Sequence, residues 1–190
     1  MPNSSSGSVN CNELVAENAH AINQLADLLV VLPGPLYRQT FGARKQHVIG
    51  KHVRHIIDHY MALLRAVNGR SAGPLDYENR QREEALELDN HAACNRLLAI
   101  INSLGRPAEW PQNTSLEMEH LSDDHRHNPH TVATSIDREL VFLASHTVHH
   151  MAIIAMLAEQ GGVEVSDGFG VHPSTLRHQQ RLHMQMTKSA

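Results

Sequence analysis

Two histidines, His146 and His150, lie four positions apart in a stretch rich in Leu, Val, Ile, Ala and Met. If that stretch is a helix, positions i and i+4 share one face about one turn apart, so both imidazoles can reach the same metal ion. His149 is a poorer partner because it projects about 100° away from His150 around the helix. Two ligands from one helix do not complete a site, so the third must come from another element.

The densest source of a third ligand is the segment 51–59, in which His52, His55 and His59 follow three- and four-residue spacings along one arc of a helix. The spacing alone does not choose among them. Neutral imidazoles suit zinc, nickel, copper or iron, and three of them leave at least one coordination position for water or a substrate atom. An open position is typical of a catalytic metal site.

Histidines on an amphipathic helix are more often surface residues than ligands, and an isolated i,i+4 pair can bind metal adventitiously. A second histidine cluster on another helix favours a native site. Around it, Asp58 could orient a ligand through a hydrogen bond, although a solvated carboxylate is the more ordinary interpretation. His59 and His149 are candidates for a proton relay by their proximity.

Four long helical patterns must position these histidines. Apolar residues recur at three- and four-residue steps, and Gly, Pro or Asn-Gly breakers end each run. The predicted helices cover roughly 11–32, 46–67, 79–104 and 135–159. Thr134 and Asp137 have the spacing of a capping box, so we expect them to begin the last helix.

The segment before the last helix loses the helical period. Residues 115–121 alternate apolar and polar side chains, and a polar stretch leads on to 131–133, which predicts a short hairpin or extended insertion. We expect its histidines, His120, His125, His127 and His130, to be surface residues. The tail contains a helix-capable piece at about 174–186.

These elements define an all-α fold class: an up-down four-helix bundle with a short extended insertion before the fourth helix and a C-terminal tail. We divide the chain into a disordered leader at 1–8, a helical bundle domain at 9–162 and a C-terminal extension at 163–190.

Composition limits the partners. The 190 residues have a formal net charge of -4 with both signs interspersed, which argues against nucleic acid or an anionic membrane as a partner. Cys11 and Cys94 lie far apart and no secretory signal pattern begins the chain, so a cytoplasmic location is expected. The outlier is histidine, with 16 residues, as many as lysine and arginine combined.

A helix-capable tail on a bundle favours a homodimer.

The segments 49–60 and 145–154 resemble the DinB/YfiT superfamily of metal-dependent enzymes. That superfamily is a four-helix bundle with a histidine triad, in which one ligand comes from the second helix and two, in H-x3-H spacing, come from a later helix. The resemblance covers roughly 11–162. It implies that His146 and His150 are two of the ligands.

The same resemblance implies His55 as the third ligand, with His59 as the alternative, and a divalent ion, most often zinc or nickel. Members with known activities include bacillithiol transferases, the mycothiol-dependent maleylpyruvate isomerase and the metal-binding domain of ergothioneine-type sulfoxide synthases. The resemblance therefore implies a thiol transferase or hydrolase that activates a low-molecular-weight thiol or water for a small-molecule substrate. The residues after His150 are Met-Ala-Ile, where the superfamily usually has Arg-Gly-Gln.

Two other functions fit the sequence, so whether the protein is an enzyme stays open. One is a non-catalytic bundle that acts as an interaction or stress-response module, because bundles host unrelated functions. The other is a di-iron carboxylate bundle, because Glu17 with His20 and Glu117 with His120 each satisfy Glu-x-x-His. The second of these pairs falls in the aperiodic segment, which weakens the di-iron reading.

Overall fold

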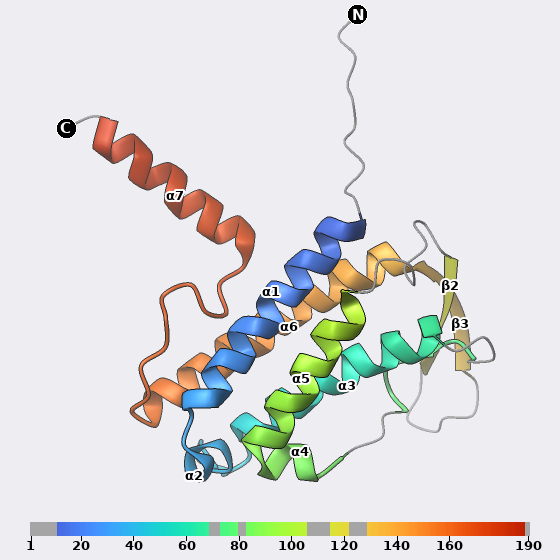
Figure 1. Cartoon of the computed structure of the whole chain (residues 1–190), viewed down its shortest axis with the longest axis horizontal. Helices are drawn as coiled ribbons and strands as arrows, with labels where there is room; N and C mark the ends of the chain where they lie inside the picture. Colours follow the sequence, from blue (N-terminus) through green and yellow to red (C-terminus); the bar gives the residue numbers. More distant parts are fainter. Residues whose placement is uncertain (1–10, 69–72, 80–82, 106–114, 122–128, 189–190) are drawn as a thin grey trace, which may run out of the picture.

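The computed structural model describes residues 11–68, 73–79, 83–105, 115–121 and 129–188. The chain folds around four long helices (Figure 1), which confirms the predicted fold class. These are α1 (Cys11–Val31), α3 (Ile49–Asn68), α5 (Asn90–Leu104) and α6 (Ile136–Gln160). The predicted leader at 1–8 lies outside the described residues.

Each long helix packs against two neighbours. Both α1 and α3 contact α5 and α6, so α1 and α3 lie on one diagonal of the bundle and α5 and α6 on the other. Figure 1 shows α1 and α6 running in one direction and α3 and α5 in the other. Two neighbouring pairs, α1 with α6 and α3 with α5, are therefore parallel, whereas an up-down order has alternating directions. As a result α3 and α6, which contain the two histidine clusters, lie side by side and antiparallel.

The predicted helix over 79–104 is wrong in its first third. The structure has a single turn, α4 (Ala85–Leu88), then an extended residue, Asp89, and only then α5. The Asp89 carboxylate accepts hydrogen bonds from the backbone N–H groups of His91 and Ala92, at 2.9 and 3.1 Å. Aspartate favours this capping geometry over a helix interior, and it interrupts the apolar period. Residues 80–82 lie outside the described part of the chain.

Replacing Asp89 by alanine should lower the free energy of unfolding by about 1 kcal/mol, because two N–H groups at the start of α5 would lose their acceptor. Urea unfolding followed by circular dichroism measures the change. The matched control is Asp89→Asn, whose side-chain oxygen caps nearly as well, so a similar loss in both variants would contradict the capping role.

The predicted insertion is confirmed as a small sheet. Strands β2 (Ser115–Leu121) and β3 (Pro129–Ser135) form an antiparallel hairpin, and β1 (Leu75–Asp76) pairs parallel with β2. The predicted capping box is wrong: β3 continues to Ser135, whose side chain accepts a hydrogen bond from the backbone N–H of Arg138 at 3.3 Å. The Thr134 hydroxyl donates instead to the carboxylate of Glu139, at 2.5 Å.

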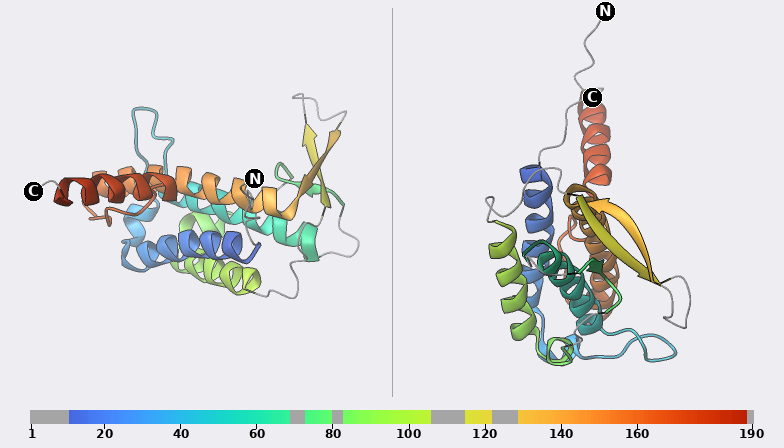
Figure 2. Two further views of the ribbon diagram at one scale, coloured as in Figure 1. Left: turned by 90° about the horizontal axis from the view of Figure 1, so that it is seen from above. Right: turned by 90° about the vertical axis from the view of Figure 1, so that its right-hand side faces the viewer.

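Two further helices complete the chain. A single turn, α2 (Gly34–Tyr37), follows the Pro33 break, and α7 (Pro173–Lys188) forms where the helix-capable tail was predicted. Figures 1 and 2 show α7 projecting away from the bundle.

Among the described helices, α6 alone has the length and mean hydropathy, 1.6, of a membrane span. Its inner face packs against α1 and α3, and Leu140, Leu143, Met151 and Ile154 there are fully buried, as expected for a helix that contributes one face to the core of a bundle.

Candidate metal centre

The structure brings together three of the predicted histidines. His55 projects from α3, and His146 and His150 project from α6 one turn apart. Each offers one ring nitrogen, and these three donor atoms all lie within 4.8 Å of one another. The helix period thus places the α6 pair on one face, and the antiparallel packing of α3 and α6 supplies the third imidazole.

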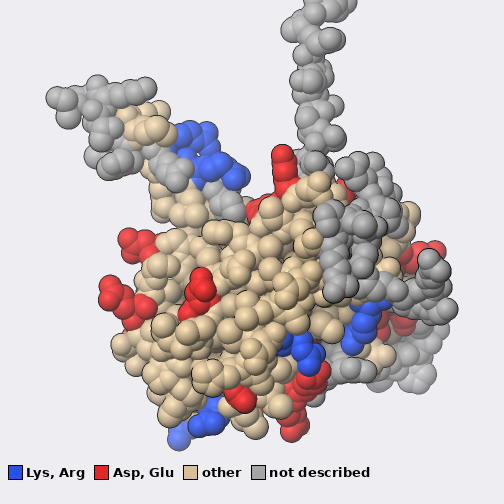
Figure 3. Space-filling view, in the orientation of Figure 1, with Lys and Arg blue, Asp and Glu red and all other residues tan. Residues whose placement is uncertain are grey.

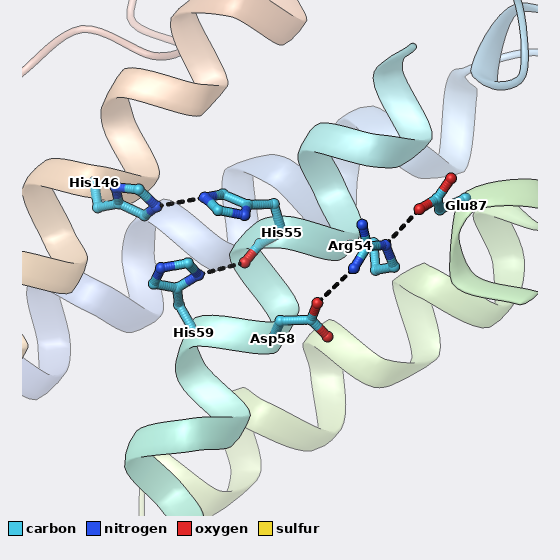
Figure 4. Close-up of polar contacts among 6 residues, drawn as sticks. All are labelled: Arg54, His55, Asp58, His59, Glu87 and His146. Carbon is cyan, nitrogen blue, oxygen red and sulfur yellow. Dashed lines mark hydrogen bonds and ion pairs between the residues drawn. The ribbon is translucent and has the colours of Figure 1, made fainter. Parts of the chain in front are cut away.

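The geometry suits a small divalent ion. The Nε2 atoms of His55 and His146 are 3.0 Å apart and face each other (Figure 4). Two imidazoles on one tetrahedral zinc, with Zn–N bonds of about 2.0–2.1 Å, would place their nitrogens about 3.3 Å apart. The ring centroid of His150 lies 4.5 Å from that of His55 and 4.6 Å from that of His146. Small side-chain movements are therefore enough to close the three nitrogens around one ion.

The local environment keeps His150 neutral, which is the form that binds metal. Burial lowers its pKa to about 3, and the imidazoles of His146, His52, His149 and His59 contribute in the same direction. Burial also lowers the pKa of His52, with His47 and His149 as further causes. The neighbouring imidazoles therefore disfavour the protonated form of His150, and a metal ion binds the neutral form.

The fallback ligand, His59, lies against the triad and is almost fully buried. Its ring centroid is 4.3 Å from that of His55 and 4.4 Å from that of His146. The Nδ1 atom of His59 lies 2.8 Å from the carbonyl oxygen of His55, so Nδ1–H donates and the neutral ring has its lone pair on Nε2. On the other side, the exposed His149 ring lies 5.3 Å from His150.

Asp58 lies on another side of α3. Its carboxylate pairs with the guanidinium of Arg54 at 2.7 Å, and Arg54 also donates to Glu87 of α4 at 2.5 Å. Figure 4 shows this chain of charges turned away from His55 and His146. The predicted role of Asp58 in orienting a ligand stays a prediction. The Asp58–Arg54 ion pair lies within α3, and the ion pair between Arg54 and Glu87 links α3 to α4.

A buried polar network beneath the triad was missed by the sequence analysis. The Tyr60 hydroxyl donates to Asn18 Oδ1 at 2.6 Å and accepts from the Thr147 hydroxyl at 3.1 Å. The Asn18 amide donates in turn to the backbone carbonyl of Leu140, at 3.0 Å. The network joins α1, α3 and α6 next to His146. Polar residues at positions that the helical period places on the buried face were the sequence signal that could have predicted it.

Glu139 holds the segment that follows β1, which contains Tyr77, beside the site. It is fully buried, and Tyr77 donates to its second carboxylate oxygen at 2.8 Å, while Arg138 and Thr134 donate to the first. The Tyr77 ring then stacks on His59, with centroids 5.1 Å apart. Tyr77 is thus a loop anchor that also forms one wall of the site.

The sequence model that describes the DinB family matches residues 1–169 of this chain. The chain belongs to the DinB family. FK506-binding protein 5 of Rhizopus delemar is 30% identical to it over 104 residues, which are 55% of this chain and 27% of that protein. The chain thus spans well under two thirds of the length of that relative. No solved structure matches the chain.

The DinB fold separates the Glu-x-x-His pairs of the di-iron alternative. Glu117 and His120 lie on β2, where residues three apart point to opposite faces of the sheet, so they cannot act as the helical motif requires. Glu17 and His20 lie on α1, outside the histidine group just described.

Among the insertion histidines, His120 and His130 are cross-strand partners in the hairpin, away from the triad. His125 and His127 lie outside the described residues, so their predicted surface position is untested.

The lowered histidine pKa values give the metal-free DinB domain a pH-dependent stability. A histidine in the unfolded chain has a pKa of about 6.5, whereas the pKa of His150 in the folded protein is about 3. Between these two pH values the unfolded chain binds a proton at His150 and the folded chain does not. The free energy of unfolding therefore decreases as the pH falls from about 6.5 to about 3. Urea unfolding in chelator between about pH 7 and pH 4 should show this loss, and it should be smaller in His150→Gln. The same pH dependence in both proteins would contradict the prediction.

Proposed function

We propose that this DinB-family protein is a metal-dependent enzyme that activates a small thiol or water, of thiol transferase or hydrolase type. The convergence of three imidazole donors from α3 and α6 within 4.8 Å supports this proposal most directly. No carboxylate or thiolate belongs to that group, and an all-imidazole set favours zinc or nickel over magnesium or calcium. Three protein ligands leave a position for the reacting molecule.

A divalent ion held there would lower the pKa of a bound thiol or water toward neutrality and so supply a nucleophile at physiological pH. Residues of the chain would accept the proton that the thiol or water releases. The carbonyl oxygen of His55 accepts the Nδ1–H of His59, so the basic nitrogen of the neutral His59 ring is Nε2. We propose His59 as the proton acceptor and the exposed His149 as the group that exchanges protons with solvent.

The walls of the site favour a small electrophile with an apolar body. Phe142 stacks on His146 with ring centroids 5.3 Å apart, and Tyr77 lies 5.5 Å from Phe142. These two rings cover one side of the triad with apolar surface, which strengthens electrostatic interactions at the ion by excluding water.

The proposal is tested on untagged protein purified without added metal. Inductively coupled plasma mass spectrometry should find about one zinc or nickel per chain. The loaded protein should then accelerate the alkylation of glutathione, cysteine or bacillithiol by monobromobimane, or the hydrolysis of 4-nitrophenyl acetate, and the chelated protein should not. Metal-free wild type that also fails to bind added zinc or nickel would refute the proposal.

A non-catalytic interaction module is the second candidate, and α7 is the observation that favours it. This helix projects from the bundle, includes Arg177 and Arg181 and has no acidic residue. In Figure 3 its basic side chains stand apart from the acidic side chains scattered over the body. We propose that α7 contributes to a homodimer, and we propose a cytoplasmic location because Cys11 and Cys94 are both free and buried.

A further inference from the structure

A fourth histidine, His52, contacts the triad from its outer side. It precedes His55 by one turn of α3, and because α6 is antiparallel it lies opposite His150. The Nδ1 atoms of His52 and His150 are 3.0 Å apart, and their ring centroids are 5.3 Å apart. Both side chains are half-buried, so this hydrogen bond is partly shielded from water.

Two ring nitrogens at this distance need one proton between them, so one Nδ1 donates and the other accepts. If His150 donates, its remaining nitrogen, Nε2, has the free lone pair and can bind an ion. His55 and His146 already approach each other through Nε2 atoms. The three ligands would then use the same ring nitrogen, which is consistent with a single convergence point.

We propose that His52 is a positioning residue: it accepts the Nδ1–H of His150 and so holds His150 in the tautomer and orientation in which Nε2 binds the metal. Ligand histidines usually donate their second N–H to a carboxylate or a carbonyl, and such partners affect metal affinity strongly. Here a neutral imidazole takes that place. Because it adds no negative charge to His150, it leaves a bound ion a stronger Lewis acid than a carboxylate partner would.

This inference rests on the metal site of the proposed function, and three variants test it. His52→Phe keeps a ring but removes the acceptor. His52→Asn keeps a side-chain oxygen close to the position of Nδ1. His149→Phe is the matched control, because it changes another imidazole whose ring lies 5.3 Å from that of His150 but for which no hydrogen bond to His150 is formed within the described residues.

Zinc dissociation constants from chelator competition should rise by about 10- to 100-fold in His52→Phe and stay near the wild-type value in His52→Asn and His149→Phe. Wild-type affinity in His52→Phe would overturn the inference while leaving the metal site intact. A large loss in His52→Asn as well would identify His52 as a direct ligand and also overturn it. Failure of the wild type to bind zinc would refute the proposed function itself.

A spectroscopic readout separates positioning from a general structural effect. Nuclear magnetic resonance of protein labelled with ¹⁵N-histidine reports which ring nitrogen is protonated and which is metal-bound. We expect His150 to be protonated at Nδ1 in the wild type with and without zinc, and to populate both tautomers in metal-free His52→Phe. An Nδ1-bound zinc at His150, or an unchanged His150 tautomer in His52→Phe, would contradict the proposal. If His52→Phe does not fold, the wild-type tautomer and His52→Asn still decide it.

Discussion

Replacement of His146 by alanine should remove the bound metal and leave the bundle folded. The side chain belongs to the triad and is only half-buried, so its loss opens no large cavity. The two remaining imidazoles are a weak chelate, and zinc or nickel measured by inductively coupled plasma mass spectrometry should fall below about a tenth of the wild-type content, because loss of even an outer-shell partner lowers affinity 10- to 100-fold. Thiol alkylation or ester hydrolysis should fall with it.

The control for His146→Ala is His120→Ala, which removes a histidine of β2 that is not part of the triad. This variant should keep its metal. Circular dichroism should show native helix content in both proteins, with unfolding free energies of the metal-free forms within about 1 kcal/mol of the wild type. If His146→Ala retains its metal, the triad is not the metal site. If His146→Ala is unfolded, the ion has a structural role.

Gly50→Ala should destabilise the protein by about 3 kcal/mol, because the new methyl group has no space. A Cβ built at Gly50 would collide with the backbone carbonyl of Glu87, and it would lie 2.9 Å both from the carbonyl carbon of Glu87 and from Cε1 of Tyr37. Helix propensity alone predicts the opposite, a gain of about 1 kcal/mol, since Gly50 is in the first turn of α3. The steric conflict with backbone is the larger effect.

Urea unfolding of Gly50→Ala measures this loss, and Gly73→Ala is its control because nothing lies within 4 Å of a Cβ at Gly73. The control should change the unfolding free energy by less than about 0.5 kcal/mol. The same small change at Gly50 would show that α3 and α4 are not packed as closely as described. Since Glu87 binds Arg54, displacement of α4 should also break that ion pair.

The helices and the α6 histidine pair follow from local sequence. Apolar residues at helical spacing and Gly or Pro breakers predicted α1, α3 and α6 to within a few residues, because amphipathic periodicity and chain termination act over a few neighbouring positions. The same local reasoning failed at Asp89. There a side chain that caps a new helix outweighed the apolar period on either side of it.

The sequence by itself determined a helical bundle with His146 and His150 on one helical face, since both properties depend only on residue spacing. The sequence did not determine which histidine of α3 lies against that pair, among His52, His55 and His59. That choice depends on the register between α3 and α6, and packing between segments far apart in the chain sets this register. The tertiary structure placed His55 in the triad, His52 beside His150 and His59 under Tyr77. It also turned Asp58 toward Arg54, because burial of a carboxylate requires a charged partner that only the folded chain supplies.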